Sequence, residues 1–154
     1  MTERQLRDVS SSTRICIDKD GRWFYEGSEI IHPTILKIFC DSLEMDGNGR
    51  YRIIVENELC YIEVEDAPFI VRTLRGDCDC GITLVLNSLA SEELDPESLF
   101  FGRDNILYAR LRSGIPVKFS RAAYYQLAMM LEESDNGDFI LKVKGKEYIV
   151  VVTL

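Results

Sequence analysis

The 154 residues, with 46% hydrophobic and 29% charged side chains, have the composition of an ordinary globular protein. The net charge of −8 argues against nucleic acid or an anionic membrane as a general partner, because both attract cationic surfaces. No stretch approaches the roughly 20 apolar residues that a membrane span requires, so we expect a cytoplasmic protein that does not bind membranes.

The N-terminal part of the chain is predicted to contain short strands and one helix. Residues 1–12 are polar and mixed in charge, and we interpret them as a disordered lead-in. Strands are predicted at 15–17 and 23–25, separated by a turn rich in Asp and Gly. Pro33 favours the first position of a helix, where its missing N–H costs nothing, and this helix is predicted to run to about Glu44.

The middle of the chain is predicted to be mainly β-structure. A hairpin is expected over residues 50–64, followed by strands at 69–74 and 82–86. Residues 91–105 are polar and form a predicted connector, with one short helical turn capped by Asp95.

The next hairpin can be analysed by the alternation of its side chains. Strands are predicted at 106–111 and 115–119. A two-residue loop would place their apolar residues on opposite faces, whereas a three-residue loop, 112–114, places them on one face. Ser120 is then predicted to cap a second helix that runs to about Glu133.

A helix, an Asn-Gly turn and a hairpin occur twice in the sequence, 88 positions apart. The segment 32–64 aligns with the second copy without gaps, so the Asn-Gly pair at 48–49 falls on the pair at 136–137. The apolar positions coincide in the helix and in the hairpin. We therefore predict an α+β fold with two copies of a strand-hairpin, helix and hairpin unit, in subdomains 13–66 and 67–154. Each copy is expected to contain antiparallel sheets and one main helix.

A group of cations stands out in this acidic chain. Residues 103–121 contain one acid and five cations, which are Arg103, Arg110, Arg112, Lys118 and Arg121. The first turn of the helix after Ser120 contains no acid to complement the positive helix end. The missing anion can be the acidic run that ends at Asp66, as an internal ion-pair network, or a bound phosphate or carboxylate.

Aromatic side chains near these arginines could stack on a ligand. Tyr108, Tyr125 and Trp23 are the candidates. The single histidine, His32, precedes the first helix and is better explained as a cap or packing residue than as a general base. The Cys-x-Cys at 78–80 is a weak metal signal. We therefore predict no catalytic residue, no metal site and no cofactor, and the sequence leaves enzymatic activity open.

Two groups of residues resemble a known family. Residues 17–27 and the segment Val-Glu-Asp-Ala-Pro-Phe at 64–69 resemble the N-terminal half of the bacterial domain of unknown function 1285 family. A Y-x-x-x-R-x-G pattern at 108–114 and an R-x-x-Y-Y-x-L pattern at 121–127 resemble its C-terminal half. The resemblance implies a duplicated α+β fold, with a C-terminal half loosely like a pleckstrin-homology barrel. It also implies a cleft between the halves that holds a nucleotide-like ligand in signalling.

These observations lead to one main functional expectation. We expect a non-enzymatic ligand-binding or sensor module of bacterial signalling that takes a small anionic, nucleotide-like ligand between its halves. The residues predicted to bind it are Arg112, Arg121, Tyr125, Tyr108, Trp23 and Asp66. The two arginines are assigned to the phosphate, and Tyr125 or Trp23 to the base.

The alternative is a protein-interaction or assembly module without a small ligand. Its surface would be an exposed edge strand at 139–144 or 147–152, which could join a protein partner or a second copy in a homodimer. Lys142, Lys144 and Lys146 are interpreted as solvated residues that protect such an edge.

Overall fold

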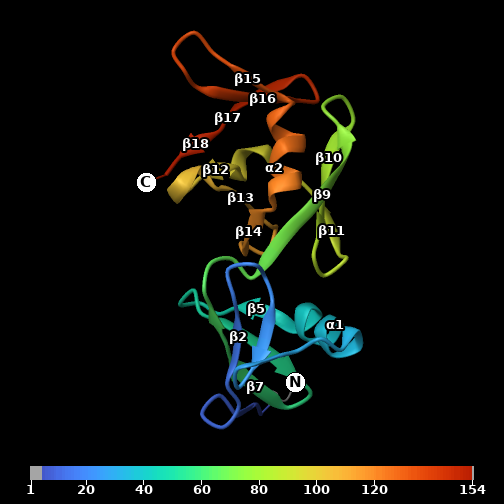
Figure 1. Ribbon diagram of the computed structural model, residues 1–154, viewed down its shortest axis with the longest axis vertical. Helices are drawn as coiled ribbons and strands as arrows, with labels where there is room; N and C mark the ends of the chain where they lie inside the picture. The colour runs from blue at the N-terminus through green and yellow to red at the C-terminus, as the bar shows by residue number, and fades with distance from the viewer. Residues whose placement is uncertain (1–4, 154) are drawn as a thin grey trace. The chain divides into compact units, whose positions relative to one another are not determined.

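The computed structural model describes residues 5–153 and divides into two compact units, Met1–Pro68 and Phe69–Leu154 (Figure 1). The described residues form four sheets and two α-helices, which confirms the predicted α+β class. Neither of these helices has the length and apolar character needed to cross a bilayer.

The N-terminal unit contains two four-stranded sheets and helix α1 (Pro33–Ser42). The first sheet has the order β1 (Arg7–Asp8), β7 (Glu58–Tyr61), β6 (Tyr51–Val55) and β5 (Leu43–Met45). The second has the order β4 (Ser28–Glu29), β3 (Trp23–Tyr25), β2 (Ile15–Ile17) and β8 (Glu63–Val64). Alternating residues of these strands face the core, so that Ile15, Ile17, Trp23 and Ile53 are buried.

Two boundaries in this unit differ from the sequence prediction. Residues 7–8, predicted as part of a disordered lead-in, form β1, because Arg7 N donates to Asn57 O at 2.7 Å. Residues 1–4 of that predicted segment lie outside the described residues. Helix α1 ends at Ser42 instead of Glu44, because Leu43 is extended and pairs with Ile53 in β5.

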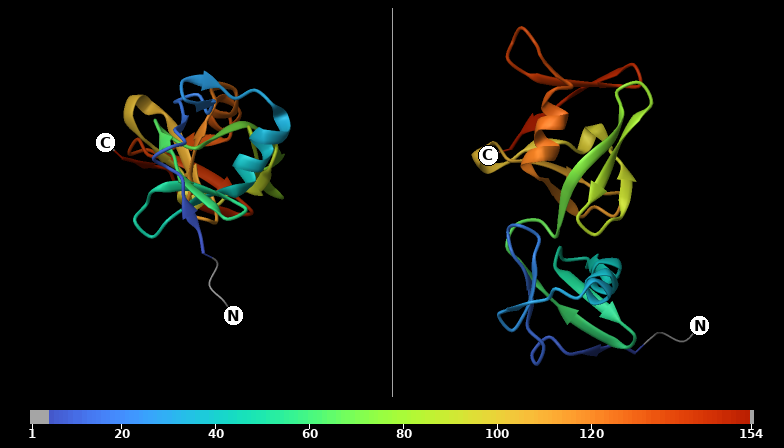
Figure 2. Two further views of the ribbon diagram at one scale, coloured as in Figure 1. Left: turned by 90° about the horizontal axis from the view of Figure 1, so that it is seen from below. Right: turned by 45° about the vertical axis from the view of Figure 1, so that its right-hand side comes forward.

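The C-terminal unit contains a seven-stranded sheet, a three-stranded sheet and helix α2 (Arg121–Ala128). The helix, in orange, can be followed in the right-hand view of Figure 2. The larger sheet has the order β11 (Ser91–Glu93), β10 (Gly81–Leu86), β9 (Phe69–Asp77), β14 (Pro116–Phe119), β13 (Leu107–Arg110), β12 (Phe100–Phe101) and β18 (Val151–Val152). The smaller sheet has the order β15 (Leu131–Glu133), β16 (Phe139–Val143) and β17 (Lys146–Ile149). Short 3-10 segments, η1 (Pro96–Ser98) and η2 (Arg103–Asn105), connect β11, β12 and β13.

The order of the smaller sheet corrects one prediction. Residues 139–144 were proposed as an edge, but β16 lies between β15 and β17 and is therefore central. The strand β17 does lie at the end of its sheet among the described residues.

The β13–β14 hairpin has the predicted three-residue loop. Arg110 pairs with Pro116, and Leu111 N donates to Ile115 O at 2.9 Å. Gly114 closes the loop with φ +87°, a conformation that costs glycine little. The apolar residues of both strands consequently lie on one buried face.

Helix α2 is held on the seven-stranded sheet by its cap and by one glutamine. Ser120 Oγ accepts a hydrogen bond from Ala123 N at 3.2 Å, which confirms the predicted cap. Gln126 Oε1 accepts from Leu74 N at 2.9 Å and from Thr73 Oγ1 at 3.0 Å, both on β9. The helix ends at Ala128, before the predicted Glu133, because the following residues form β15.

The β2–β3 turn depends on one carboxylate. Asp18 Oδ1 accepts from Asp20 N at 2.9 Å and from Arg22 N at 2.8 Å, and Oδ2 accepts from Arg22 Nε at 3.0 Å. Burial alone would raise the pKa of Asp18, but these hydrogen bonds and the Arg22 charge outweigh it and lower the pKa below its ordinary value. The ionised form therefore stabilises the turn.

We predict that Asp18→Ala lowers the free energy of unfolding at pH 7 by about 1–2 kcal/mol, because several hydrogen bonds are lost together. A lowered folded-state pKa means that this stabilisation is present above the unfolded pKa of about 3.9 and is lost as the pH falls through the folded-state value. The difference in the free energy of unfolding between the Asp18 variant and the wild type should thus become smaller at acidic pH. Urea titrations at several pH values would measure it. Asp20→Ala, in the same turn, is the control and should cost less. An Asp18 variant as stable as wild type at pH 7 would contradict the assignment.

Candidate functional site

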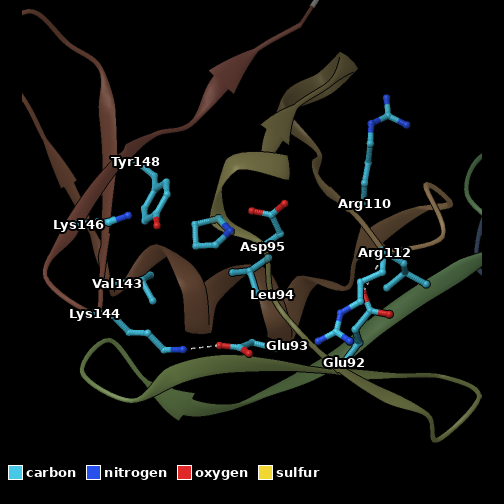
Figure 3. A pocket seen from close by; sticks show the side chains of 12 residues that line it. Glu92, Glu93, Leu94, Asp95, Arg110, Arg112, Val143, Lys144, Lys146 and Tyr148 are labelled. Carbon is cyan, nitrogen blue, oxygen red and sulfur yellow. Dashed lines mark hydrogen bonds and ion pairs between the residues drawn. The ribbon is translucent and has the colours of Figure 1, made fainter.

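The C-terminal unit contains a surface pocket of about 470 Å³ (Figure 3). Its walls come from β11, the start of η1, the β13–β14 loop and the tip of the β16–β17 hairpin. Four cationic side chains line it, from Arg110, Arg112, Lys144 and Lys146. The other polar side chains are those of Glu92, Glu93, Asp95 and Tyr148.

The three acids of the pocket already accept hydrogen bonds from protein groups. Glu92 Oε2 accepts from Arg112 N at 2.8 Å, and this bond holds the β13–β14 loop against β11. Asp95 Oδ1 accepts from Glu97 N at 3.1 Å and caps η1, as the sequence predicted. Glu93 Oε1 accepts from Lys144 Nζ at 2.7 Å. The carboxylates therefore act mainly in holding the walls together.

The Glu93–Lys144 pair fixes the tip of the β16–β17 hairpin over β11. The hydrogen bond from Lys144, together with its charge, lowers the pKa of Glu93, and the same bond raises the pKa of Lys144. Both groups therefore remain ionised around neutral pH. The backbone of Lys144 is left-handed, with φ +51°, and its N–H donates to Cys78 O at 2.8 Å, so the tip is held by main chain and side chain.

The four cations differ in what they contact. Lys144 is paired with Glu93, and the Arg110 guanidinium lies over the Phe100 ring at 5.3 Å and points away from the pocket in Figure 3. Among residues 5–153, no ion pair within 4 Å engages the Arg112 guanidinium or the Lys146 ammonium. These two cations retain donors for a ligand.

One of the six predicted binding residues, Arg112, lines this pocket, and the other five lie elsewhere. Arg121 and Tyr125 are exposed on α2. Tyr108 stacks on Phe100 with ring centroids 5.3 Å apart. Trp23 is 3% exposed and packs against Phe39 in the core of the N-terminal unit, and the half-buried Asp66 follows β8. Ligand binding by these five residues stays a prediction.

Local sequence patterns do not identify the lysines and the tyrosine of the hairpin as pocket residues. Lys144 and Lys146 were interpreted as solvated edge residues, and Tyr148 was not singled out. Glu93 and Lys144 lie 51 residues apart in the chain, so only the folded sheets bring them together. A local signal existed in the Lys-Gly-Lys sequence at 144–146, which is typical of a tight hairpin tip that exposes two cations.

The fold defines this molecule as an α+β protein in which a small N-terminal unit precedes a C-terminal unit with a seven-stranded sheet. Residues 7–67 match the model of a domain of unknown function, the DUF1285 N-terminal domain. The N-terminal unit of the chain therefore belongs to the DUF1285 family, which confirms the resemblance predicted from the sequence.

Two crystal structures of DUF1285 family proteins have a similar fold. The protein from Silicibacter pomeroyi DSS-3 matches with a TM-score of 0.78 and 21% identity, over 94% of this chain and 82% of that chain. The protein from Shewanella baltica OS155 matches with a TM-score of 0.67 and 23% identity, over 78% of this chain and 94% of that chain. No curated protein matches the sequence. At these identities the crystal structures establish a shared fold.

Proposed function

We propose that this protein is a non-enzymatic ligand-binding or sensor module of bacterial signalling, and that its C-terminal unit binds a small anionic, nucleotide-like ligand in the pocket of Figure 3. One observation carries the proposal: Arg112 and Lys146 line a pocket whose acids already accept hydrogen bonds from protein groups. The guanidinium of Arg112 and the ammonium of Lys146 supply charged donors there, which suit phosphate or carboxylate oxygens.

The shape of the pocket is compatible with a ligand of this size. A volume of about 470 Å³ lies within the range of small-molecule sites. Arg112 and Lys146 lie on opposite sides of Asp95 in Figure 3, so two separate anionic groups, or one group and a polar extension, could be bound. Tyr148 lies on the side of Lys146 and offers a half-buried ring for stacking.

We predict that Arg112→Ala and Lys146→Ala each weaken binding of adenosine or guanosine phosphates at least about tenfold, because each removes a charge-assisted hydrogen bond. Thermal-shift and calorimetric titrations with mono- and triphosphates, and with inorganic phosphate, would measure the effect. The Arg112 variant keeps its main-chain bond to Glu92, so the loop should stay in place.

Lys142→Ala is the matched control for this experiment. Lys142 belongs to the same hairpin, but its ammonium contacts Glu132 at 3.3 Å and Glu147 at 3.8 Å and does not line the pocket. Its substitution should leave binding unchanged. If none of these compounds stabilises the wild type more than the double variant of Arg112 and Lys146, the ligand proposal fails.

A second candidate function, assembly through a strand edge, is favoured by the surface of the last strands. Ile149, Val151 and Val152 are all more than half exposed, and β17 and β18 lie at the ends of their sheets among the described residues. An exposed apolar edge is a common site for pairing with another chain.

We predict that any self-association of the wild type at about 0.1 mM is abolished by Ile149→Lys, because a charge on an edge strand opposes pairing. Sedimentation velocity over a range of concentrations would detect it. Met129→Lys, at an exposed apolar residue beyond α2, is the control and should behave like wild type. Association that survives the Ile149 substitution would exclude this edge.

We also propose that the two units are copies of one duplicated unit. The bounds of β5, β6, β7 and β8 recur 88 positions later in β15, β16, β17 and β18. Strand register recurs as well, since the pair Leu43 and Ile53 corresponds to Leu131 and Leu141. Even the left-handed residue of the hairpin recurs, as Glu56 in one unit and Lys144 in the other. Agreement in bounds, register and backbone conformation supports a common origin.

The preceding hairpins agree at a slightly different offset. Cys16 pairs with Phe24 on β3 and with Glu63 on β8. Phe100, 84 positions after Cys16, pairs with Tyr108 on β13 and with Val151 on β18 in the same directions.

We also propose that the C-terminal unit resembles a pleckstrin-homology barrel. Its seven-stranded sheet and its helix support this likeness.

If the units are copies, equivalent cap positions should be interchangeable. His32 occupies the N-cap of α1 in an extended conformation but makes no side-chain cap bond, whereas Ser120 at the equivalent position of α2 does. We predict that His32→Ser raises the free energy of unfolding by about 0.5–1 kcal/mol and that Ser120→Ala lowers it by about 1 kcal/mol. Urea titrations would measure both changes. A neutral or destabilising His32→Ser would count against the equivalence, and His32→Ala is the control that removes the imidazole without supplying a cap.

A further inference from the structure

In the C-terminal unit, strand β14 has a neighbour on each side. It pairs with β13 in the antiparallel direction and with β9 in the parallel direction, where Val117 lies opposite Phe69 and Phe119 opposite Val71. The cap of helix α2 is bonded to β9, because Ser120 N donates to Val71 O at 3.0 Å and Ser120 Oγ donates to Arg72 O at 3.2 Å. Strand β9 thus completes the sheet and covers the buried face of α2.

The equivalent strand in the N-terminal unit lies at an edge. Strand β4 pairs with β3 as β14 pairs with β13, and it leads into α1 as β14 leads into α2. In the order β4, β3, β2, β8, however, β4 is terminal. Among residues 5–68, therefore, no strand occupies the position that β9 takes in the C-terminal unit.

Helix α1 is correspondingly uncovered. None of its residues is buried, and Ile31, Ile35 and Ile38 are 76%, 41% and 45% exposed. The counterpart of Ile35 in α2 is Ala123, which is fully buried. Helix α1 contacts β6, whereas α2 contacts β9 and β14. Three exposed isoleucines thus follow the terminal strand β4 in the chain, and we call these residues, together with the open edge of β4, the α1–β4 surface.

We propose that the α1–β4 surface accepts an extended segment of a partner polypeptide, which pairs in parallel with β4 and covers α1 as β9 covers α2. The proposal rests on the duplication proposed above, because β9 is the template for the position of the added strand. Addition of a strand to an open sheet edge is an established mode of peptide recognition.

The template also specifies the chemistry of the partner. Strand β9 buries its first, third and sixth residues, Phe69, Val71 and Leu74, and exposes Arg72. The partner segment should therefore carry apolar residues at the first, third and sixth positions. Glu26 and Glu29 are exposed at and just before β4, so basic residues between the apolar ones complement the acceptor. His32 is the N-cap residue of α1, as Ser120, which donates to Arg72 O, is the N-cap residue of α2.

The test uses the full chain and a synthetic peptide with the sequence of residues 67–75, Ala-Pro-Phe-Ile-Val-Arg-Thr-Leu-Arg. Added to isotopically labelled protein, the peptide should give saturable shifts of the amide signals of β4 and α1, with a dissociation constant of about 0.1–1 mM, because a short edge offers few hydrogen bonds. A peptide of the same composition in scrambled order is the control and should give no saturable shift.

Variants of the protein test the surface itself. Ile35→Lys and Ile38→Lys should each weaken binding at least about tenfold, since lysine is a good helix former and leaves α1 intact while opposing an apolar partner. Met129→Lys should bind like wild type, and circular dichroism verifies that all variants are folded.

Several outcomes would overturn the proposal. One is that the scrambled peptide binds as tightly as the peptide of residues 67–75, and another is that the Ile38 variant binds that peptide as tightly as the wild type. A third is that the shifts are confined to β14 and α2, which would mean that the peptide replaces β9 in its own sheet. A concentration-dependent dimer that Ile38→Lys abolishes, without peptide binding, would assign the surface to a second copy and also overturn it. Failure of the duplication itself would appear separately, in the cap substitutions at His32 and Ser120.

Discussion

The parallel pairing of β9 with β14 is the contact on which the C-terminal unit depends. It joins the β9–β10–β11 branch of the sheet to the β14–β13–β12 branch. Glu93 lies on the first branch, and Arg112 lies in the β13–β14 loop of the second, so this pairing and the bond from Arg112 N to Glu92 together position the two sides of the pocket. The same contact buries Val71 and anchors the cap of α2, which couples the core to the position of the site.

The charges of the pocket serve two different purposes. Lys144 and Glu93 are both about half exposed, and such a pair adds little to stability, but it determines where the hairpin tip lies. The bond from Arg112 N to Glu92 likewise positions the loop without using the guanidinium. Because the acids hold the walls through these contacts, the site presents the charges of Arg112 and Lys146 to its interior, in a protein whose net charge is −8. In a protein that otherwise repels anions, such a locally cationic pocket would determine the position at which an anion binds.

The parts of the fold that depend on local chemistry could be predicted from the sequence. The three-residue loop after Leu111 followed from side-chain alternation, and the caps at Ser120 and Asp95 followed from residue type. The ends of the helices could not be predicted, because β5 and β15 are short strands that exist only through pairing with β6 and β16. For the same reason the sequence identified Arg112 but not Lys146 as a pocket residue, since the hairpin tip meets β11 through contacts distant in the chain.

Each unit contains strands to which the proposed duplication assigns no counterpart, β1 in the N-terminal unit and β9, β10 and β11 in the C-terminal unit. In the N-terminal unit, β1 pairs with β7, whereas β17, which lies 88 positions after β7, is terminal in its sheet. In the C-terminal unit, β9 pairs with β14, whereas β4, the counterpart of β14 in the proposed duplication, is terminal. Exposed isoleucines occur at both open edges, Ile149 on β17 and Ile31 after β4. An apolar residue at an unpaired edge carries an aggregation risk that charged residues would remove at little cost. The exposed isoleucines at both edges therefore support the strand pairing that we propose for each of them.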